Sequence, residues 1–234
     1  QVIDNFGDIG VCWRLTRDLA ARGHTVRLWV DDASALQWMA PDVRWATRGV
    51  HRVGTLGAIT VHSWSAATVA DDVPEPGDVV IEAFGCNPPE AFLARMARPA
   101  PPRWINLEYL SAEDYVERSH GLQSPVWSGP AAGLVKHFFY PGFTARTGGL
   151  LREPGLIAAQ DAIREDAALS AATLTDLRIP HQPGERLASV FCYAHAPLAS
   201  RLDALAAEPV PTRLLLTPGH ATRLGEARAH ARTP

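Results

Sequence analysis

The chain has 234 residues, of which 47% are apolar and 20% charged, with a formal net charge of −3. This composition can bury one large core or two modest ones, and its charge balance excludes a general nucleic-acid binder. Three sparse cysteines indicate a reduced cytoplasmic protein without a zinc site, and no apolar run approaches the roughly 20 residues that span a membrane.

The first predicted unit consists of a strand, a loop, a helix and a second strand. Val2-Ile3 is the end of an apolar strand, a helix is expected over residues 9–21, and Gly23 stops that helix before a strand at 25–30. The residues expected on the inner face of the helix are Val11, Cys12, Leu15 and Leu19. So compact a unit predicts a parallel βαβ arrangement.

Further strands are expected along the first 150 residues, at 58–64, 78–84, 103–108 and 135–140. The strand at 78–84 is almost continuously apolar, so we expect it to be covered on both faces. Ser111 is a plausible N-cap for a helix that begins there.

The pattern predicts an α/β protein with two Rossmann-like domains. The first domain covers residues 1–154, and a second domain begins at residue 185. Between them, residues 155–184 form a helical connector whose end is rich in helix-breaking proline and glycine. In the second domain only two strands, at 187–193 and 212–217, flank a helix at 198–207. Two strands are too few for an α/β domain, so we expect residues 185–234 to be an incomplete one.

The loop from Asp4 to Asp8 follows the first strand, where open α/β sheets place ligands. It lacks the glycine spacing of dinucleotide sites, which disfavours a nicotinamide-dependent enzyme, and its two carboxylates would repel a phosphate. The loop therefore suits a cationic or proton-donating group, and Gly7 could bring Asp4 and Asp8 to one wall of a cleft. The alternative is structural: Asp8 caps the helix and Asp4 stabilises the turn.

Two other strand ends carry candidate residues. Glu108 ends the strand at 103–108, on the same rim as the first loop if the sheet is parallel, or else belongs to a capped helix start. Phe191 and Tyr193 lie on one face of the strand at 187–193, where they could stack on a nucleobase or pack in the core.

Other motifs have structural explanations. The aromatic segment 136–143 is typical of a core strand, and Thr147-Gly148-Gly149 of a flexible turn. The pairs Asp31-Asp32 and Asp71-Asp72 are not flanked like a metal-binding motif, so we assign them to loops, and the nine histidines form no ligand pattern.

Several segments together resemble the elongation factor P arginine rhamnosyltransferase family. The segments are Val2-Ile3-Asp4-Asn5-Phe6-Gly7-Asp8-Ile9-Gly10-Val11, Trp13-Arg14-Leu15, Leu28-Trp29-Val30-Asp31-Asp32, Val79-Val80-Ile81-Glu82-Ala83-Phe84, and residues 106–114, 138–144 and 147–153. The match is strong over residues 1–153, thins in the connector and returns at Phe191-Cys192-Tyr193.

The resemblance implies a two-domain GT-B glycosyltransferase whose domains face a cleft. It would transfer L-rhamnose with inversion, without a metal or cofactor, from dTDP-β-L-rhamnose to an arginine side chain of translation elongation factor P. The first domain would hold the acceptor protein and the second the donor. The family's Arg-Gly-Glu-Asp-Ser-like segment, which contacts the diphosphate, does not occur in residues 1–234.

The resemblance also assigns roles to the candidate residues. Asp8 matches the family's proposed general base and Asp4 its neighbouring catalytic aspartate, while Phe191 and Tyr193 match aromatic positions beside the nucleotide. Glu108 and Asn5 are candidates for acceptor binding. Two alternatives stay open: a GT-B enzyme with another donor or acceptor, and an acceptor-binding module without activity.

Overall fold

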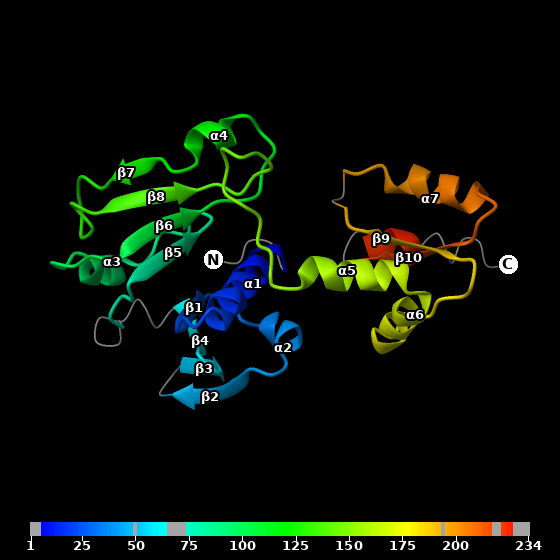
Figure 1. Cartoon of the computed structure of the whole chain (residues 1–234), viewed down its shortest axis with the longest axis horizontal. Coiled ribbons are helices and arrows are strands. Elements are labelled where there is room, and N and C mark those ends of the chain that lie inside the picture. The colour runs from blue at the N-terminus through cyan, green and yellow to red at the C-terminus, as the bar shows by residue number, and fades with distance from the viewer. Residues whose placement is uncertain (1–5, 49–50, 65–73, 193–194, 217–220, 227–234) are drawn as a thin grey trace. The chain divides into compact units, whose positions relative to one another are not determined.

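The structure is a computed structural model that describes residues 6–48, 51–64, 74–192, 195–216 and 221–226 (Figure 1). The chain folds into two compact units, residues 1–153 and 154–234. Both units contain helices and strands, so the predicted mixed α/β class is confirmed. The first predicted strand, at Val2-Ile3, lies outside the described residues.

The first unit contains a sheet with the strand order β1-β4-β3-β2. Its elements are β1 (Val26–Val30), β2 (Arg44–Arg48), β3 (His51–Leu56) and β4 (Ile59–Ser63), with helices α1 (Gly7–Ala21) and α2 (Leu36–Met39). β1 and β4 are parallel, whereas β2, β3 and β4 pair antiparallel. The sequence predicted β1 and β4 but missed the β2–β3 hairpin, whose strands mix arginines with apolar residues.

The core of this part forms where α1 and α2 cover the sheet. Ile9 and Trp13 of α1 pack with Leu36 of α2 and Val61 of β4. The predicted inner face of α1 was wrong for Val11, which is 40% exposed. The helix is rotated so that Ile9, Trp13 and Thr16 face inward instead.

A second sheet of the first unit has the order β5-β6-β8-β7. Its elements are β5 (Val79–Ala83), β6 (Arg103–Leu107), β7 (Gln123–Pro125) and β8 (Val135–Phe139), with helices α3 (Glu90–Met96) and α4 (Tyr115–Ser119). β5, β6 and β8 are parallel, as their apolar character predicts, and β7 pairs antiparallel with β8. The helix expected from Ser111 begins four residues later, because the Ser111 hydroxyl accepts the Glu113 N–H in a turn rather than capping a helix.

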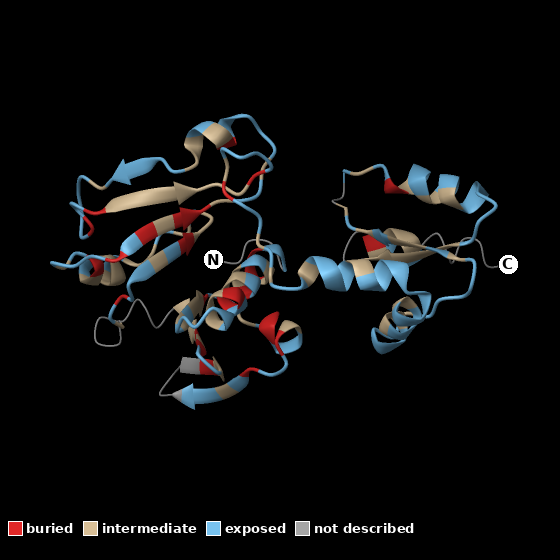
Figure 2. Cartoon of the chain, viewed as in Figure 1, coloured by how far each residue is buried: buried red, intermediate tan, exposed pale blue. Residues whose placement is uncertain are grey.

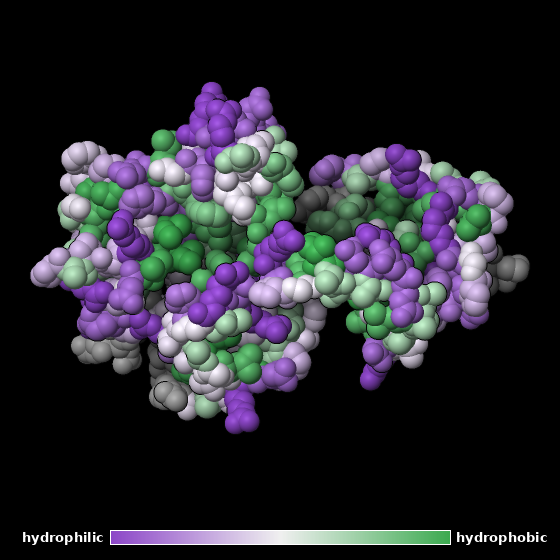
Figure 3. Space-filling view, in the orientation of Figure 1, coloured by the Kyte–Doolittle hydropathy of each residue, from purple (hydrophilic) through white to green (hydrophobic). Residues whose placement is uncertain are grey.

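A cavity of about 700 Å³ is lined by residues of β1, β5 and α1. Figure 3 shows apolar side chains gathered over β5 and β6, around a hollow in the surface. Val79 and Ile81 line the cavity and are 50% and 38% exposed, so the described residues do not cover this strand on both faces.

The second unit pairs β9 (Arg186–Val190) in parallel with β10 (Thr212–Leu216). Its helices are α5 (Leu156–Glu165), α6 (Ala167–Asp176) and α7 (Leu198–Ala207). The predicted connector thus contains α5 and α6, neither of which has a buried residue among those described (Figure 2). None of the helices described in either unit is both long and apolar enough to cross a bilayer.

An ion pair connects α1 to the end of the first unit. Arg14 donates from Nε and one terminal nitrogen to the two carboxylate oxygens of Glu153, at 2.7 Å each. These hydrogen bonds lower the pKa of Glu153 from 4.5 to about 2. Two of the segments that carry the family resemblance, 13–15 and 147–153, are therefore joined in space.

The turn at Thr147-Gly148-Gly149 is tightly packed rather than loose. Gly148 donates its N–H to the Tyr140 carbonyl at 2.7 Å, and a Cβ at this position would lie 2.5 Å from the Phe139 ring. The absence of a side chain at Gly148 therefore allows the turn to lie against the end of β8.

We predict that Gly148→Ala lowers the free energy of unfolding by about 1–3 kcal/mol, because the ring and the backbone must move apart. Gly149→Ala is the matched control, since no atom lies within 4 Å of its Cβ position. Urea denaturation of both variants measures the difference. Equal stabilities would contradict the close packing at Gly148.

We also predict that Glu153→Gln lowers stability at pH 7 by roughly 0.5 kcal/mol, as is usual for a partly exposed ion pair. The folded-state pKa of Glu153 is lowered, so the stabilisation is present above about pH 4.5 and is lost as the pH falls towards 2. Thermal melts across this range should show the variant and the wild type converging. A double-mutant cycle with Arg14→Gln isolates the energy of the pair, and a difference that is independent of pH would contradict the prediction.

Candidate active site

Asp8 lies in the first turn of α1 and is only 3% exposed. Phe6 is the N-cap residue of this helix, and its side chain makes no capping hydrogen bond. The part of the structural alternative that makes Asp8 the helix cap is therefore wrong, and its other part, a turn stabilised by Asp4, lies outside the described residues. A buried carboxylate at a helix N-terminus benefits from the helix dipole and can also accept hydrogen bonds from other partners.

Tyr109 provides one such partner from the other sheet of the first unit. Its hydroxyl donates to Oδ1 of Asp8 at 2.9 Å, across 101 residues of sequence. The Tyr109 ring stacks on Phe84, with centroids 4.1 Å apart and planes 5° from parallel. Phe84 directly follows β5, Tyr109 lies two residues after the end of β6, and Asp8 lies in the first turn of α1, so three elements meet at this point.

The loop after β5 is held in an unusual conformation. Phe84 and Asn87 both have positive φ angles, 57° and 48°, which residues other than glycine rarely adopt. Two buried polar side chains bind the loop: Asn106 accepts the Gly85 N–H at 3.2 Å, and Glu82 accepts the Asn87 N–H at 3.1 Å. These hydrogen bonds help to offset the backbone strain that places Phe84 under Tyr109.

Glu108 directly follows β6, at the strand end that the sequence predicted. The Asn106 amide donates to its Oε1 at 2.6 Å, which fixes the orientation of the carboxylate. Burial and then the Glu108 charge raise the pKa of the nearby Tyr140. Asn106 is 1% exposed and uses its oxygen for the loop after β5 and its nitrogen for Glu108.

Glu82 on β5 forms a buried polar cluster beneath this rim. Its Oε2 accepts from the Trp104 indole at 3.0 Å and lies 2.8 Å from the Lys136 ammonium. That ammonium also lies 4.5 Å from the centre of the Trp104 ring. The buried charge of Glu82 is thus neutralised and fully engaged, so Glu82 serves as support for the loop.

The remaining candidate residues are less well defined. Asp4, Asn5 and Tyr193 lie outside the described residues, so their proposed roles stay predictions. Phe191 follows the end of β9 at Val190 and is 66% exposed in this chain, so its role at the nucleobase also stays a prediction. In the first unit, the structure joins Asp8 to Tyr109 and Glu108 to Asn106.

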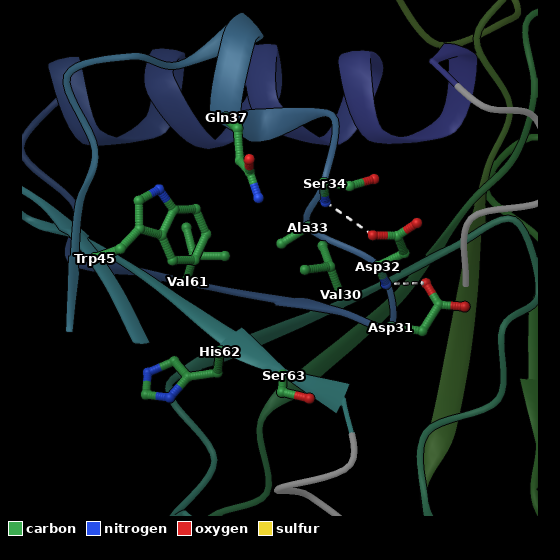
Figure 4. A pocket seen from close by; sticks show the side chains of 10 residues that line it. All are labelled: Val30, Asp31, Asp32, Ala33, Ser34, Gln37, Trp45, Val61, His62 and Ser63. Atoms are coloured by element: carbon green, nitrogen blue, oxygen red, sulfur yellow. Dashed lines mark hydrogen bonds between the residues drawn. The ribbon is translucent and has the colours of Figure 1, made fainter. Parts of the chain in front are cut away.

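A smaller pocket of about 260 Å³ lies at the carboxyl ends of β1 and β4 (Figure 4). Asp31 accepts the Asp32 N–H at 3.0 Å, and Asp32 accepts the Ser34 N–H at 2.8 Å, which lowers the pKa of Asp32. Both carboxylates thus bind their own loop, in agreement with the loop prediction. The pair Asp71-Asp72 lies outside the described residues.

Sequence reasoning missed Tyr109 and Asn106 as site residues. Both lie within two positions of Glu108, and the polar Asn106 interrupts an otherwise apolar strand, which was a detectable signal. Nothing in the sequence around Tyr109 or Asp8 indicated that these two residues contact each other.

Comparison with known proteins identifies the family. The family model described as "Elongation-Factor P (EF-P) rhamnosyltransferase EarP" matches residues 1–232. Protein-arginine rhamnosyltransferase of Pseudomonas putida is 45% identical over 98% of this chain and 60% of its own length. The Pseudomonas aeruginosa protein of the same name is 41% identical over 94% of the chain and 56% of its own length.

The similarity extends beyond Pseudomonas. A Neisseria meningitidis protein-arginine rhamnosyltransferase is 46% identical over 65% of the chain and 37% of its own length. The chain therefore spans about 60% or less of the length of these curated relatives. With the family match over nearly all its residues, this chain belongs to the EF-P rhamnosyltransferase EarP family.

Proposed function

We propose that the protein containing this chain is an inverting, metal-independent glycosyltransferase that moves L-rhamnose from dTDP-β-L-rhamnose to an arginine of elongation factor P. The observation that carries the proposal is the buried Asp8 carboxylate at the start of α1, hydrogen-bonded to Tyr109. Family membership supports the reaction class, and the names of the relatives support an arginine acceptor.

Arginine is a difficult nucleophile because its charge is delocalised and its pKa lies above about 12. A carboxylate cannot hold it neutral, but it can bind the planar N–H groups, orient one nitrogen and accept its proton as the new bond forms. We assign proton acceptance to Asp8 and orientation to Asp4. Asn5 and Glu108 contribute to acceptor binding.

The reaction is a single in-line displacement. The arginine nitrogen forms a bond to the anomeric carbon while the bond from that carbon to the dTDP oxygen breaks, and dTDP leaves with the electron pair. The nitrogen's proton passes to the Asp8 carboxylate late in the step, when attack on the sugar has made the nitrogen more acidic. One displacement inverts the anomeric configuration.

The proposed architecture is GT-B, with an acceptor domain at residues 1–154 and the start of a dTDP-rhamnose domain at 185–234, joined by 155–184. The exposed Phe191, with Tyr193, provides aromatic surface for the nucleobase. Two alternatives have distinct outcomes: another donor or acceptor would be found with a donor panel, and an acceptor-binding module would bind EF-P without transfer.

Intact-mass analysis of EF-P tests the function. EF-P and dTDP-rhamnose are incubated with this chain and, separately, with the protein at the full length of its relatives. Addition of one deoxyhexose by the full-length form supports the proposal. If that form is folded and adds nothing, the donor or the acceptor has been wrongly assigned.

We predict that Asp8→Asn in the full-length enzyme lowers kcat by about 10²–10⁴-fold, the usual contribution of a general base. Affinity for dTDP-rhamnose should not change, because Asp8 lies in the acceptor unit. Asp18→Asn, on the same helix, is the matched control and should retain activity within about twofold. Near-normal turnover by Asp8→Asn would eliminate Asp8 as the base.

We further predict that the double substitution Phe191→Ala and Tyr193→Ala weakens dTDP binding by roughly 5- to 100-fold, since stacking contributes about 1–3 kcal/mol per base. Phe143→Ala is the control, because Phe143 is 65% exposed, as Phe191 is 66%, but lies in the first unit. Calorimetric titration with dTDP measures the effect. Unchanged affinity in the double variant would defeat the stacking role.

A further inference from the structure

Tyr109 combines two features that a guanidinium site requires. One ring face lies flat on Phe84, yet the residue is 50% exposed. Its hydroxyl, at the edge of the same ring, donates to the buried Asp8 carboxylate. A flat aromatic surface and a carboxylate are thus joined in one side-chain arrangement.

The fold keeps this ring in place at an energetic cost. Phe84 has a φ angle of 57°, and its N–H donates to the Leu107 carbonyl at 2.7 Å. The loop that follows is bound by Asn106 and Glu82, both 1% exposed. Strained backbone that is held by buried polar contacts is typical of functional positions.

A guanidinium is the cation best suited to such a surface. It is planar, weakly hydrated and stacks on aromatic rings, and its N–H groups bind carboxylates within its own plane. A lysine ammonium is compact and strongly hydrated, so it gains less from a flat ring. The arrangement therefore favours arginine over lysine.

We infer that the Tyr109 ring, backed by Phe84, is the surface on which the acceptor guanidinium lies, and that the Tyr109 hydroxyl orients the Asp8 carboxylate towards it. This inference rests on the proposed function and specifies how the acceptor side chain is recognised. Phe84 acts through Tyr109 and is a positioning residue.

The two parts of Tyr109 are separable by substitution in the full-length enzyme. Tyr109→Phe keeps the ring and removes the hydroxyl, so kcat should fall about 10- to 100-fold with the KM for EF-P within about twofold of wild type. Tyr109→Leu removes both, so KM should also rise about three- to tenfold. Phe84→Leu retains the hydroxyl and should raise KM mainly.

The preference for arginine over lysine can be measured separately, by binding. EF-P with its acceptor arginine replaced by lysine is titrated beside normal EF-P, and the ratio of the two dissociation constants is measured. The preference for arginine should persist in Tyr109→Phe and shrink about three- to tenfold in Tyr109→Leu. A purely structural role for Tyr109 would not change this ratio.

Tyr115→Leu is the matched control, because Tyr115 is 44% exposed and packs edge-on against Tyr140. Thermal melts establish that each variant folds. If Tyr109→Leu unfolds, Tyr109→Trp replaces it in the comparison with Tyr109→Phe. Because tryptophan keeps a flat ring, the KM of Tyr109→Trp should match that of Tyr109→Phe.

Three outcomes overturn the inference: unchanged kcat and KM in the Tyr109 variants, identical losses in the phenylalanine and leucine variants, and a KM for the tryptophan variant that rises well above that of the phenylalanine variant. A wild-type enzyme that adds no deoxyhexose to EF-P would instead count against the proposed function. The two failures are therefore distinguishable.

Discussion

The buried carboxylate of Glu82 constrains the geometry of the whole candidate site. It accepts hydrogen bonds from the Trp104 indole and the Asn87 N–H and pairs with Lys136, so it connects β5, β6 and β8 to the loop after β5. Removing one partner of a buried ion pair costs roughly 3–5 kcal/mol, because the other charge is left uncompensated. An apolar side chain at position 82 would have no acceptor for the Asn87 N–H. The polar cluster thus occupies a position where apolar side chains could pack, and in return its hydrogen bonds fix the loop after β5.

From this cluster the site is built outward in steps. The fixed loop presents Phe84, Phe84 supports the Tyr109 ring, and the Tyr109 hydroxyl reaches Asp8. Asn106 performs a parallel task, since one amide binds both the loop and Glu108. The Asp8 carboxylate accepts a hydrogen bond from the neutral Tyr109 hydroxyl, and the Glu108 carboxylate accepts one from the neutral Asn106 amide. A neutral donor orients a carboxylate without cancelling its charge.

The sequence predicted those features that depend on local pattern. The apolar runs that form β4, β5, β6 and β8 were found, as was the position of Glu108 at a strand end, because strand ends follow from where such runs stop. The β2–β3 hairpin was missed because its short, arginine-containing strands lack clear alternation, and the rotation of α1 was misjudged because Val11 is apolar yet exposed. The contact of Asp8 with Tyr109 could not be predicted, since no local pattern connects residues 101 positions apart.

The two sheets of the first unit explain why Asp8 must come from a third element. β1, β5 and α1 all line the cavity, with Asp8 in the first turn of the helix. A parallel βαβ unit would place the strand before α1 beside β1, and the sequence predicts such a strand at Val2-Ile3. Among the described residues, the first turn of α1 brings Asp8 to the Tyr109 hydroxyl, and Tyr109 stacks on Phe84. Phe84 and Tyr109 follow the carboxyl ends of β5 and β6, which is where open α/β sheets generally place their ligand sites.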